Sequence, residues 1–267
     1  MNDRYTGKVI LVTGATRGIG EYIARRMANE GGKVAICGRS EKEGQALAKE
    51  LGGPEKAIFI RADLSQVDDC FKVVDETVAT FGRLDVLVNN AASVSRGTVE
   101  NTTPEKFDAM MAINVRAPFL TIQRAMPTFK KQFKEEQNGG VIINITSVNS
   151  YVGAPNLAAY SASKGALVTL SRNLGNSLAQ YRIRVHALNV GWTLTDGERV
   201  VQREEENAPE DWAERIGATR PWGRLLLPED IAAVACFVAS DEARVFSGEV
   251  IDLEQFPMWS PGPAREG

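Results

Sequence analysis

The segment Thr13–Gly20 (TGATRGIG) lies between a β-branched apolar run and the start of a helical pattern. Its glycines, Gly14, Gly18 and Gly20, let the backbone turn tightly and approach a pyrophosphate, while the following helix offers free N–H groups and a positive dipole end. The spacing is Gly-x3-Gly-x-Gly and differs from the better-known Gly-x-Gly-x2-Gly fingerprint. Glycines between a strand and a helix can simply allow a tight turn. Three of them after the first strand of a chain in which strands and helices alternate favour nucleotide binding. We therefore expect a dinucleotide cofactor to contact Gly14, Thr16, Arg17, Gly18, Ile19 and Gly20.

Short runs rich in Val and Ile alternate with longer helical patterns along the whole chain. This alternation is typical of an α/β fold in which a parallel sheet carries helices on both faces. We expect a single domain, residues 1–267, built on a Rossmann-type doubly wound sheet of about seven strands. The expected strands are 8–13, 33–37, 57–62, 84–88, 140–146, 183–190 and 249–253. The expected helices are 19–30, 41–51, 66–81, 104–133 (bent at Pro118 and Pro127), 157–180 and 228–239.

The composition excludes several kinds of site. The chain holds 31 Lys+Arg against 34 Asp+Glu, so it lacks the basic surplus of a nucleic-acid-binding surface. Its one histidine, His186, lies in a strand-like run, where we expect a structural role with hydrogen bonds near the sheet. The three cysteines are far apart and without the spacing of metal ligands. Acid–base chemistry must therefore come from Tyr, Lys, Asp or Glu, and no metal site is expected.

The N-terminal residues MNDRYTGK lack the apolar core of a secretory signal. No apolar run reaches the roughly 18 residues that a membrane-spanning helix needs. Together with the scattered cysteines, these features predict a cytoplasmic protein with neither membrane nor nucleic-acid partners.

The end of the second expected strand bears on the choice of cofactor, since it reads Cys37-Gly38-Arg39-Ser40. An acidic residue here would bind the adenosine ribose 2′-hydroxyl and select NAD, but Gly38 offers no carboxylate. Arg39 follows Gly38, and Arg17 in the glycine turn can reach the same position, next to the adenosine ribose. Guanidinium groups match phosphate oxygens, so the pair favours NADP. The alternatives are that both arginines are solvated surface residues and that NAD is used.

A Tyr-x3-Lys pair lies in the expected helix 157–180. Tyr160 and Lys164 are four residues apart, so both side chains lie on one helix face. Ser147 ends the fifth expected strand, and carboxyl ends of parallel strands line the ligand crevice. A free phenol has a pKa of about 10, so ionising it at pH 7 costs about 4 kcal/mol, which a nearby ammonium reduces. Such a pair alone is usually structural, but beside the glycine turn and the strand-ending serine it indicates proton transfer.

With these pieces the chain resembles the short-chain dehydrogenase/reductase (SDR) family over nearly all its length. The matching segments are TGATRGIG (13–20), AD (62–63), NNAA (89–92), the Asn of INV (114), the Ser of ITS (147), YSASK (160–164) and NVGWTLT (189–195). The resemblance implies that Tyr160 is the catalytic acid/base, Lys164 its activator and Ser147 the hydroxyl that orients the carbonyl. It implies that Asn114 is a link in a water-mediated proton relay. It also implies cofactor contacts from Asp63, Leu64, Asn90, Ala91, Tyr160, Lys164, Gly191, Thr193 and Thr195.

The same resemblance implies an oxidoreductase that interconverts a secondary alcohol and a ketone by hydride transfer. Asn149 and Asn156 flank the predicted carbonyl site, and their amides favour a polar substrate such as a sugar, a polyol or a hydroxy ketone. Trp192 is a third candidate substrate contact. Two alternatives stay open: an NADPH-dependent reductase of 3-oxoacyl thioesters, and a non-catalytic NADP-sensing protein on the same fold.

Substrate specificity is expected in loops over the crevice. These are 93–96, 148–157 and the charged segment 196–216. The last belongs to a lid at about 190–220, which we expect to be helical and solvated, with an acidic patch that grips substrate as the alternative. The C-terminal tail, 254–267, carries Phe256, Met258 and Trp259, which either pack at a subunit interface or cover the protein's own core. Members of the family commonly form tetramers, so a homotetramer or homodimer is expected.

Overall fold

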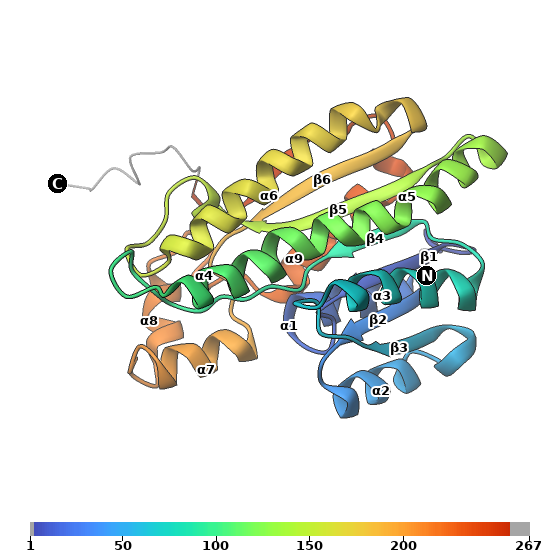
Figure 1. The fold of residues 1–267 in the computed structure, drawn as a ribbon. Coiled ribbons are helices and arrows are strands. Elements are labelled where there is room, and N and C mark those ends of the chain that lie inside the picture. Colours follow the sequence, from blue (N-terminus) through green and yellow to red (C-terminus); the bar gives the residue numbers. More distant parts are fainter. Residues whose placement is uncertain (1–2, 257–267) are drawn as a thin grey trace.

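The structure is a computed structural model that describes residues 3–256. In this part of the chain, parallel strands form a seven-stranded sheet in the order β3-β2-β1-β4-β5-β6-β7 (Figure 1), which confirms the predicted fold class. The strands are β1 (Val9–Thr13), β2 (Lys33–Gly38), β3 (Ala57–Arg61), β4 (Val86–Asn89), β5 (Gly140–Ser147), β6 (Ile183–Val190) and β7 (Val250–Leu253). The α-helices are α1 (Gly18–Asn29), α2 (Glu41–Glu50), α3 (Val67–Phe81), α4 (Pro104–Met111), α5 (Ala117–Glu136), α6 (Ala158–Ser177), α7 (Asp196–Glu204), α8 (Trp212–Ala218) and α9 (Pro228–Ala239). Within residues 3–256 no helix is long and apolar enough to cross a membrane.

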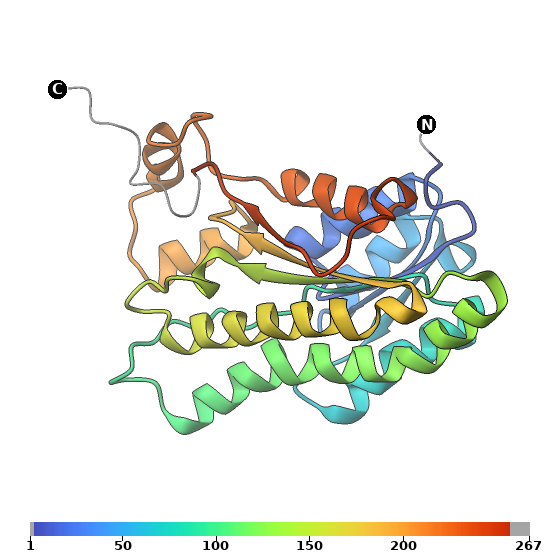
Figure 2. The ribbon, with the colours of Figure 1, turned by 90° about the horizontal axis from the view of Figure 1, so that it is seen from above.

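The sheet is covered by helices on both faces, which explains why its strands are almost continuously apolar. Along β1, Ile10 and Val12 belong to a buried cluster that includes residues of α1 and α9. Leu11, between them, faces the opposite cluster, which contains residues of α3 and α5. Figure 2 shows α1 and α9 on one side of the sheet and α5 and α6 on the other.

The order of the strands fixes where a ligand can bind. Strand β1 pairs with both β2 and β4, so the chain runs outward to β3 and then returns to the other side of β1. In such sheets the crevice lies beyond the carboxyl ends of the strands at this reversal. The segment Thr13–Gly20 leaves β1 there, and the segment 89–92 leaves β4 beside it.

The expected helix 104–133 is interrupted. Thr103 caps α4 by accepting a hydrogen bond from the Lys106 N–H at 3.3 Å, and Pro104 is the first helical residue, as expected. Between α4 and α5 the backbone forms a π-helical turn, Ala112–Arg116. Such turns insert an extra residue into a helix and are frequent at functional sites. This one carries the predicted relay residue Asn114.

The charged segment after β6 is helical, as expected, and forms α7 and α8. Figure 1 shows both helices at the end of the sheet where α4 begins. This lid is not wholly solvated, because Trp212, Ala213 and Leu225 form a small buried cluster of its own, against which Trp192 packs. Of the aromatic tail, Phe256 lies with its ring centroid 5.9 Å from the Arg220 guanidinium carbon. Met258 and Trp259 lie outside the described residues.

Candidate active site

The glycine turn is held against the end of β4. Gly14 has a φ of +62°, and a Cβ on it would lie 2.7 Å from the Ala91 Cα, so the position requires glycine. Asn90 secures the turn from the other side, because its Nδ2 donates to the carbonyls of Thr13 (2.9 Å) and Gly14 (3.0 Å). Helix α1 then begins at Gly18, so its unpaired N–H groups lie at the turn.

A cavity of about 330 Å³ lies beside this turn. It brings together residues that follow β1, β2, β3, β4 and β6. The predicted cofactor residues that line it are Gly14, Thr16, Arg17, Gly18, Ile19, Arg39, Asp63, Leu64, Asn90, Ala91 and Thr195. Sequence reasoning missed Cys37, Gly38, Ser40, Ala62, Ala92, Ile113 and Gly197, most of which are neighbours of predicted residues at the same strand ends. The lining is polar and rich in glycine, and it lies at the N-terminus of α1. Such a cavity fits the phosphate-bearing half of a dinucleotide.

Five predicted cofactor residues lie outside that lining, and two of them, Tyr160 and Lys164, belong to the group described below. Gly20 packs inside the turn, where a Cβ would lie 2.7 Å from the Gly14 carbonyl oxygen. Gly191 follows β6, and its N–H donates to the Leu253 carbonyl at 2.8 Å. Thr193 is buried and donates its hydroxyl to the Gly191 carbonyl at 3.0 Å.

The predicted proton-transfer residues meet at the carboxyl end of β5. Ser147 on β5 and Tyr160 on α6 lie close enough for their side chains to interact, and this interaction lowers the pKa of Tyr160. Burial raises the pKa of Tyr160, whereas the Ser147 hydroxyl and the Arg96 guanidinium lower it and the Glu198 carboxylate raises it. Three neighbouring side chains therefore change the pKa of Tyr160, and of these the sequence had predicted only Ser147 as a site residue.

Lys164 lies under the tyrosine ring. Its Nζ is 5.7 Å from the centroid of the Tyr160 ring and donates to the Ile145 carbonyl at 2.8 Å. Burial lowers the pKa of Lys164 to about 8, because the ammonium is removed from water. A lysine of this pKa changes its charge near neutral pH.

Asn114 is fully buried, and its amide is committed to other protein groups. It exchanges hydrogen bonds with the backbone of Ser93 and donates to the Ser163 hydroxyl at 2.9 Å. The π-helical turn thus presents Asn114 to the loop after β4. Its predicted part in a water-mediated relay stays a prediction.

The predicted substrate contacts fall into two groups. Asn149 lies beside the reacting hydroxyls, since its N–H and Nδ2 donate to the Ser147 Oγ at 3.3 and 3.4 Å. Asn156 and Trp192 instead bind glutamates of the lid, Glu206 and Glu198, at 2.9 Å each. A cation that sequence reasoning did not single out, Arg96, lies among these groups, although loop 93–96 was a predicted specificity loop.

His186 is not part of this site. The imidazole is fully buried in β6 and lies edge-on to the Phe246 ring, with centroids 5.3 Å apart. Its two ring nitrogens have no hydrogen-bond partner within residues 3–256, so the expected hydrogen bonding near the sheet is wrong. Burial and the Arg184 charge lower the pKa of His186 to about 4.

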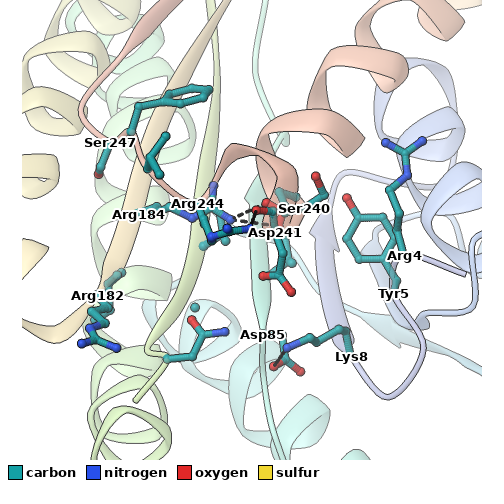
Figure 3. A pocket seen from close by; sticks show the side chains of 18 of the residues that line it. Arg4, Tyr5, Lys8, Asp85, Arg182, Arg184, Ser240, Asp241, Arg244 and Ser247 are labelled. Atoms are coloured by element: carbon teal, nitrogen blue, oxygen red, sulfur yellow. Dashed lines mark hydrogen bonds and ion pairs between the residues drawn. The ribbon is translucent and has the colours of Figure 1, made fainter. Parts of the chain in front are cut away.

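A larger cavity, of about 510 Å³, contains none of the predicted site residues. Its cationic side chains already have partners within the chain, some of which are drawn in Figure 3. Lys8 pairs with Asp85 at 3.8 Å, and Arg184 donates to backbone carbonyls at the end of α9. Its cations therefore serve the packing of the chain rather than a visible ligand site.

Comparisons with known proteins agree with this geometry. The sequence profile described as short chain dehydrogenase matches residues 8–206. The chain is 40% identical to an uncharacterized oxidoreductase of Thermotoga maritima over 94% of this chain and 97% of that protein. It is 34% identical to the NADP-dependent (R)-specific alcohol dehydrogenase of Lentilactobacillus kefiri, over 93% of this chain and 95% of that one.

The fold comparison gives the same result. The crystal structure of 3-ketoacyl-(acyl-carrier-protein) reductase from Brucella melitensis complexed with NADH superposes with a TM-score of 0.83 and 33% identity. The match covers 94% of this chain and 98% of that one. The chain therefore belongs to the short-chain dehydrogenase family of oxidoreductases.

Proposed function

We propose that the protein interconverts a secondary alcohol and a ketone, with NADP as the preferred cofactor. The observation that carries this proposal is the grouping of three side chains: Ser147 interacts with the Tyr160 hydroxyl, and the Lys164 Nζ lies 5.7 Å from the centroid of the Tyr160 ring. Two hydroxyls held together can both reach one substrate oxygen. Such an arrangement suits proton transfer to or from that oxygen.

A nicotinamide cofactor bound along the cavity supplies the acceptor or donor of the hydride. In ketone reduction Tyr160 gives its hydroxyl proton to the substrate oxygen, and in alcohol oxidation it takes that proton. Ser147 donates to the same oxygen and stabilises the negative charge that develops on it. Lys164 and the N-terminus of α6, whose first turn contains Tyr160, favour the phenolate. Because burial raises the pKa of Tyr160, the protonated form needed for reduction dominates at neutral pH.

Three observations support the NADP preference. Arg17 and Arg39 both line the cavity and are exposed, and neither forms an ion pair within residues 3–256, so both guanidiniums are free to bind a phosphate. Gly38 offers no carboxylate to select NAD, and a Cβ there would lie 2.8 Å from the Thr16 Cγ2, so a carboxylate-bearing residue would require Thr16 to move. The alcohol dehydrogenase relative is NADP-dependent.

The substrate that the site supports best is a polar hydroxy compound: a sugar, a polyol or a hydroxy ketone. Asn149, Arg96 and Glu198 place amide, guanidinium and carboxylate groups around Ser147 and Tyr160. A reductase of 3-oxoacyl thioesters is the second candidate, which the likeness to the ketoacyl reductase favours. The test follows NADPH absorbance with a panel of hydroxy ketones and one 3-oxoacyl thioester. Turnover of the thioester alone overturns the polar-substrate proposal, and no turnover of any carbonyl compound overturns the enzymatic one.

We also propose that the chain forms a homotetramer or homodimer, in line with the family resemblance. Two large apolar side chains near the last strand support it: Phe237 on α9 and Val245 just before β7 are exposed. Light scattering on the purified protein gives its mass in solution. A monomer at micromolar concentration overturns this proposal.

A further inference from the structure

Arg96 is held between two glutamates of the lid. Its Nη2 lies 3.4 Å from the Glu198 Oε1, and its Nε lies 3.2 Å from the Glu206 Oε1. The three side chains are only 21, 17 and 35% exposed, in that order, so these pairs are better shielded than ordinary surface ion pairs. Arg96 follows β4, whereas both glutamates follow β6. The cluster therefore joins the loop after β4 to the lid.

Neutral side chains extend the same contacts. Asn156 donates to the Glu206 Oε1, and Trp192 and Gln202 donate to the Glu198 Oε1, each at 2.9 Å. Three of the loops expected to govern specificity are thus fixed to one another. The contacts that join these loops centre on three charged side chains, the positive Arg96 and the negative Glu198 and Glu206.

The cluster lies next to the proposed reaction. Arg96 and Glu198 both act on the hydroxyl of Tyr160, the first favouring its ionised form and the second opposing it. A substrate with its oxygen at Ser147 and Tyr160 therefore places its neighbouring groups within reach of these charges.

We propose that Arg96, Glu198 and Glu206 form a charge filter, which admits neutral hydroxylated substrates and excludes those that carry a carboxylate or phosphate near the reacting carbon. This inference rests on the proposed alcohol–ketone activity. An anionic substrate would need Arg96 as its partner, but two carboxylates already neutralise that guanidinium, and the cluster as a whole carries a net negative charge. A neutral hydroxyl can donate to a glutamate or accept from the arginine without opposing that charge.

A matched pair of substrates tests the filter. The pair is the best neutral hydroxy ketone of the panel and the keto acid with a carboxylate in place of its hydroxymethyl group; hydroxyacetone and pyruvate are the shortest such pair. The ratio of kcat/KM between the two is compared among variants. Effects on proton transfer cancel in this ratio, because both compounds use the same tyrosine.

The variants should move the ratio in opposite directions. Glu206→Gln and Glu198→Gln remove a negative charge and should shift the ratio toward the keto acid by about tenfold. Arg96→Gln leaves both glutamates and should shift it about tenfold toward the neutral ketone. A tenfold change is about 1.4 kcal/mol, which is the Coulomb interaction of two unit charges about 12 Å apart at an effective dielectric constant of about 20. Glu204→Gln, on the exposed side of α7, is the matched control and should leave the ratio unchanged.

The outcomes separate this inference from the activity on which it rests. If the protein reduces neutral ketones but the Glu206→Gln and Arg96→Gln variants leave the ratio unchanged, or move it in the same direction, the filter is wrong and the activity stands. If no carbonyl compound is turned over, the proposed function is wrong, and the filter with it. A purely structural cluster would lower both activities together and leave their ratio at the wild-type value.

Discussion

Asn114 and Ser93 exchange two hydrogen bonds: the Asn114 Oδ1 accepts from the Ser93 N–H at 2.8 Å, and its Nδ2 donates to the Ser93 carbonyl at 2.9 Å. This exchange fixes the first residues of the loop that leads to Arg96. The same amide also donates to the Ser163 hydroxyl, one residue before Lys164. One buried side chain therefore positions the loop after β4 relative to α6, which carries the proposed catalytic pair.

Replacing Asn114 should accordingly affect both stability and substrate binding. Asn114→Ala leaves one buried partner, the Ser163 hydroxyl, and two partly buried ones, the Ser93 N–H and carbonyl, without their bonds, and we expect the free energy of unfolding to fall by about 3 kcal/mol. KM should rise, because the loop after β4 loses its anchor. Urea unfolding and steady-state kinetics measure the two effects. Ser163→Ala, which removes one of these bonds, is the control and should cost about 1 kcal/mol; an equal loss in both variants contradicts the anchoring role.

Tyr160→Phe tests the proposed proton transfer. The substitution keeps the ring and removes the hydroxyl that contacts Ser147, so kcat should fall about a thousandfold, within the range for loss of a general acid. NADPH binding, followed by fluorescence titration, should be unchanged, since Tyr160 lies outside the lining of the cofactor cavity. Tyr181→Phe, at the far end of β6, provides a control for loss of a hydroxyl. Near-normal turnover in Tyr160→Phe would remove the tyrosine from the mechanism.

Arg39→Gln tests the cofactor preference. A charge-assisted hydrogen bond to phosphate is worth about 1.5–3 kcal/mol, so the preference for NADPH over NADH in kcat/KM should fall by at least about tenfold. The loss should come from a weaker interaction with NADPH, with the NADH value little changed. Arg39→Lys keeps the positive charge but lacks the planar guanidinium that can bind a phosphate through two N–H groups. Its preference for NADPH should fall between those of the wild type and the Arg39→Gln variant. Equal losses with both cofactors would indicate that Arg39 does not contact the 2′-phosphate.

The main segments of this site could be predicted from sequence patterns, because each of them is a short contiguous stretch of the chain. Strand β5, for example, is a short segment rich in Val and Ile that ends in Ser147, and a parallel sheet places such ends along one edge. The Tyr160–Lys164 spacing likewise fixes one helix face. Residues of this kind are specified within a few positions of one another, so the sequence alone locates them.

Two other features depend on contacts that no local pattern encodes. The π-helical turn at Ala112–Arg116 interrupts a segment that the pattern predicts as one helix, bent at Pro118 but continuous. Arg96 and Glu198 are 102 residues apart and meet only because their loops leave β4 and β6 at the same edge of the sheet. The sequence therefore predicted the family and the placement of the Ser147, Tyr160 and Lys164 side chains, whereas the ion pairs of Arg96 could be found only from the fold.

His186 gives a prediction for stability against pH. Its pKa is about 4 in the folded protein and about 6.5 in an unfolded chain, so between these values the unfolded state binds a proton that the folded state does not. Stability is therefore lost as the pH falls from about 6.5 to 4, and by pH 5 this residue alone should cost about 2 kcal/mol. His186→Phe keeps an aromatic ring against Phe246 and removes the titrating group. Urea unfolding at pH 7.5 and 5.0 should show a decrease in stability about 2 kcal/mol smaller in the variant than in the wild type, and parallel decreases in the two proteins would mean that the imidazole is protonated inside the fold.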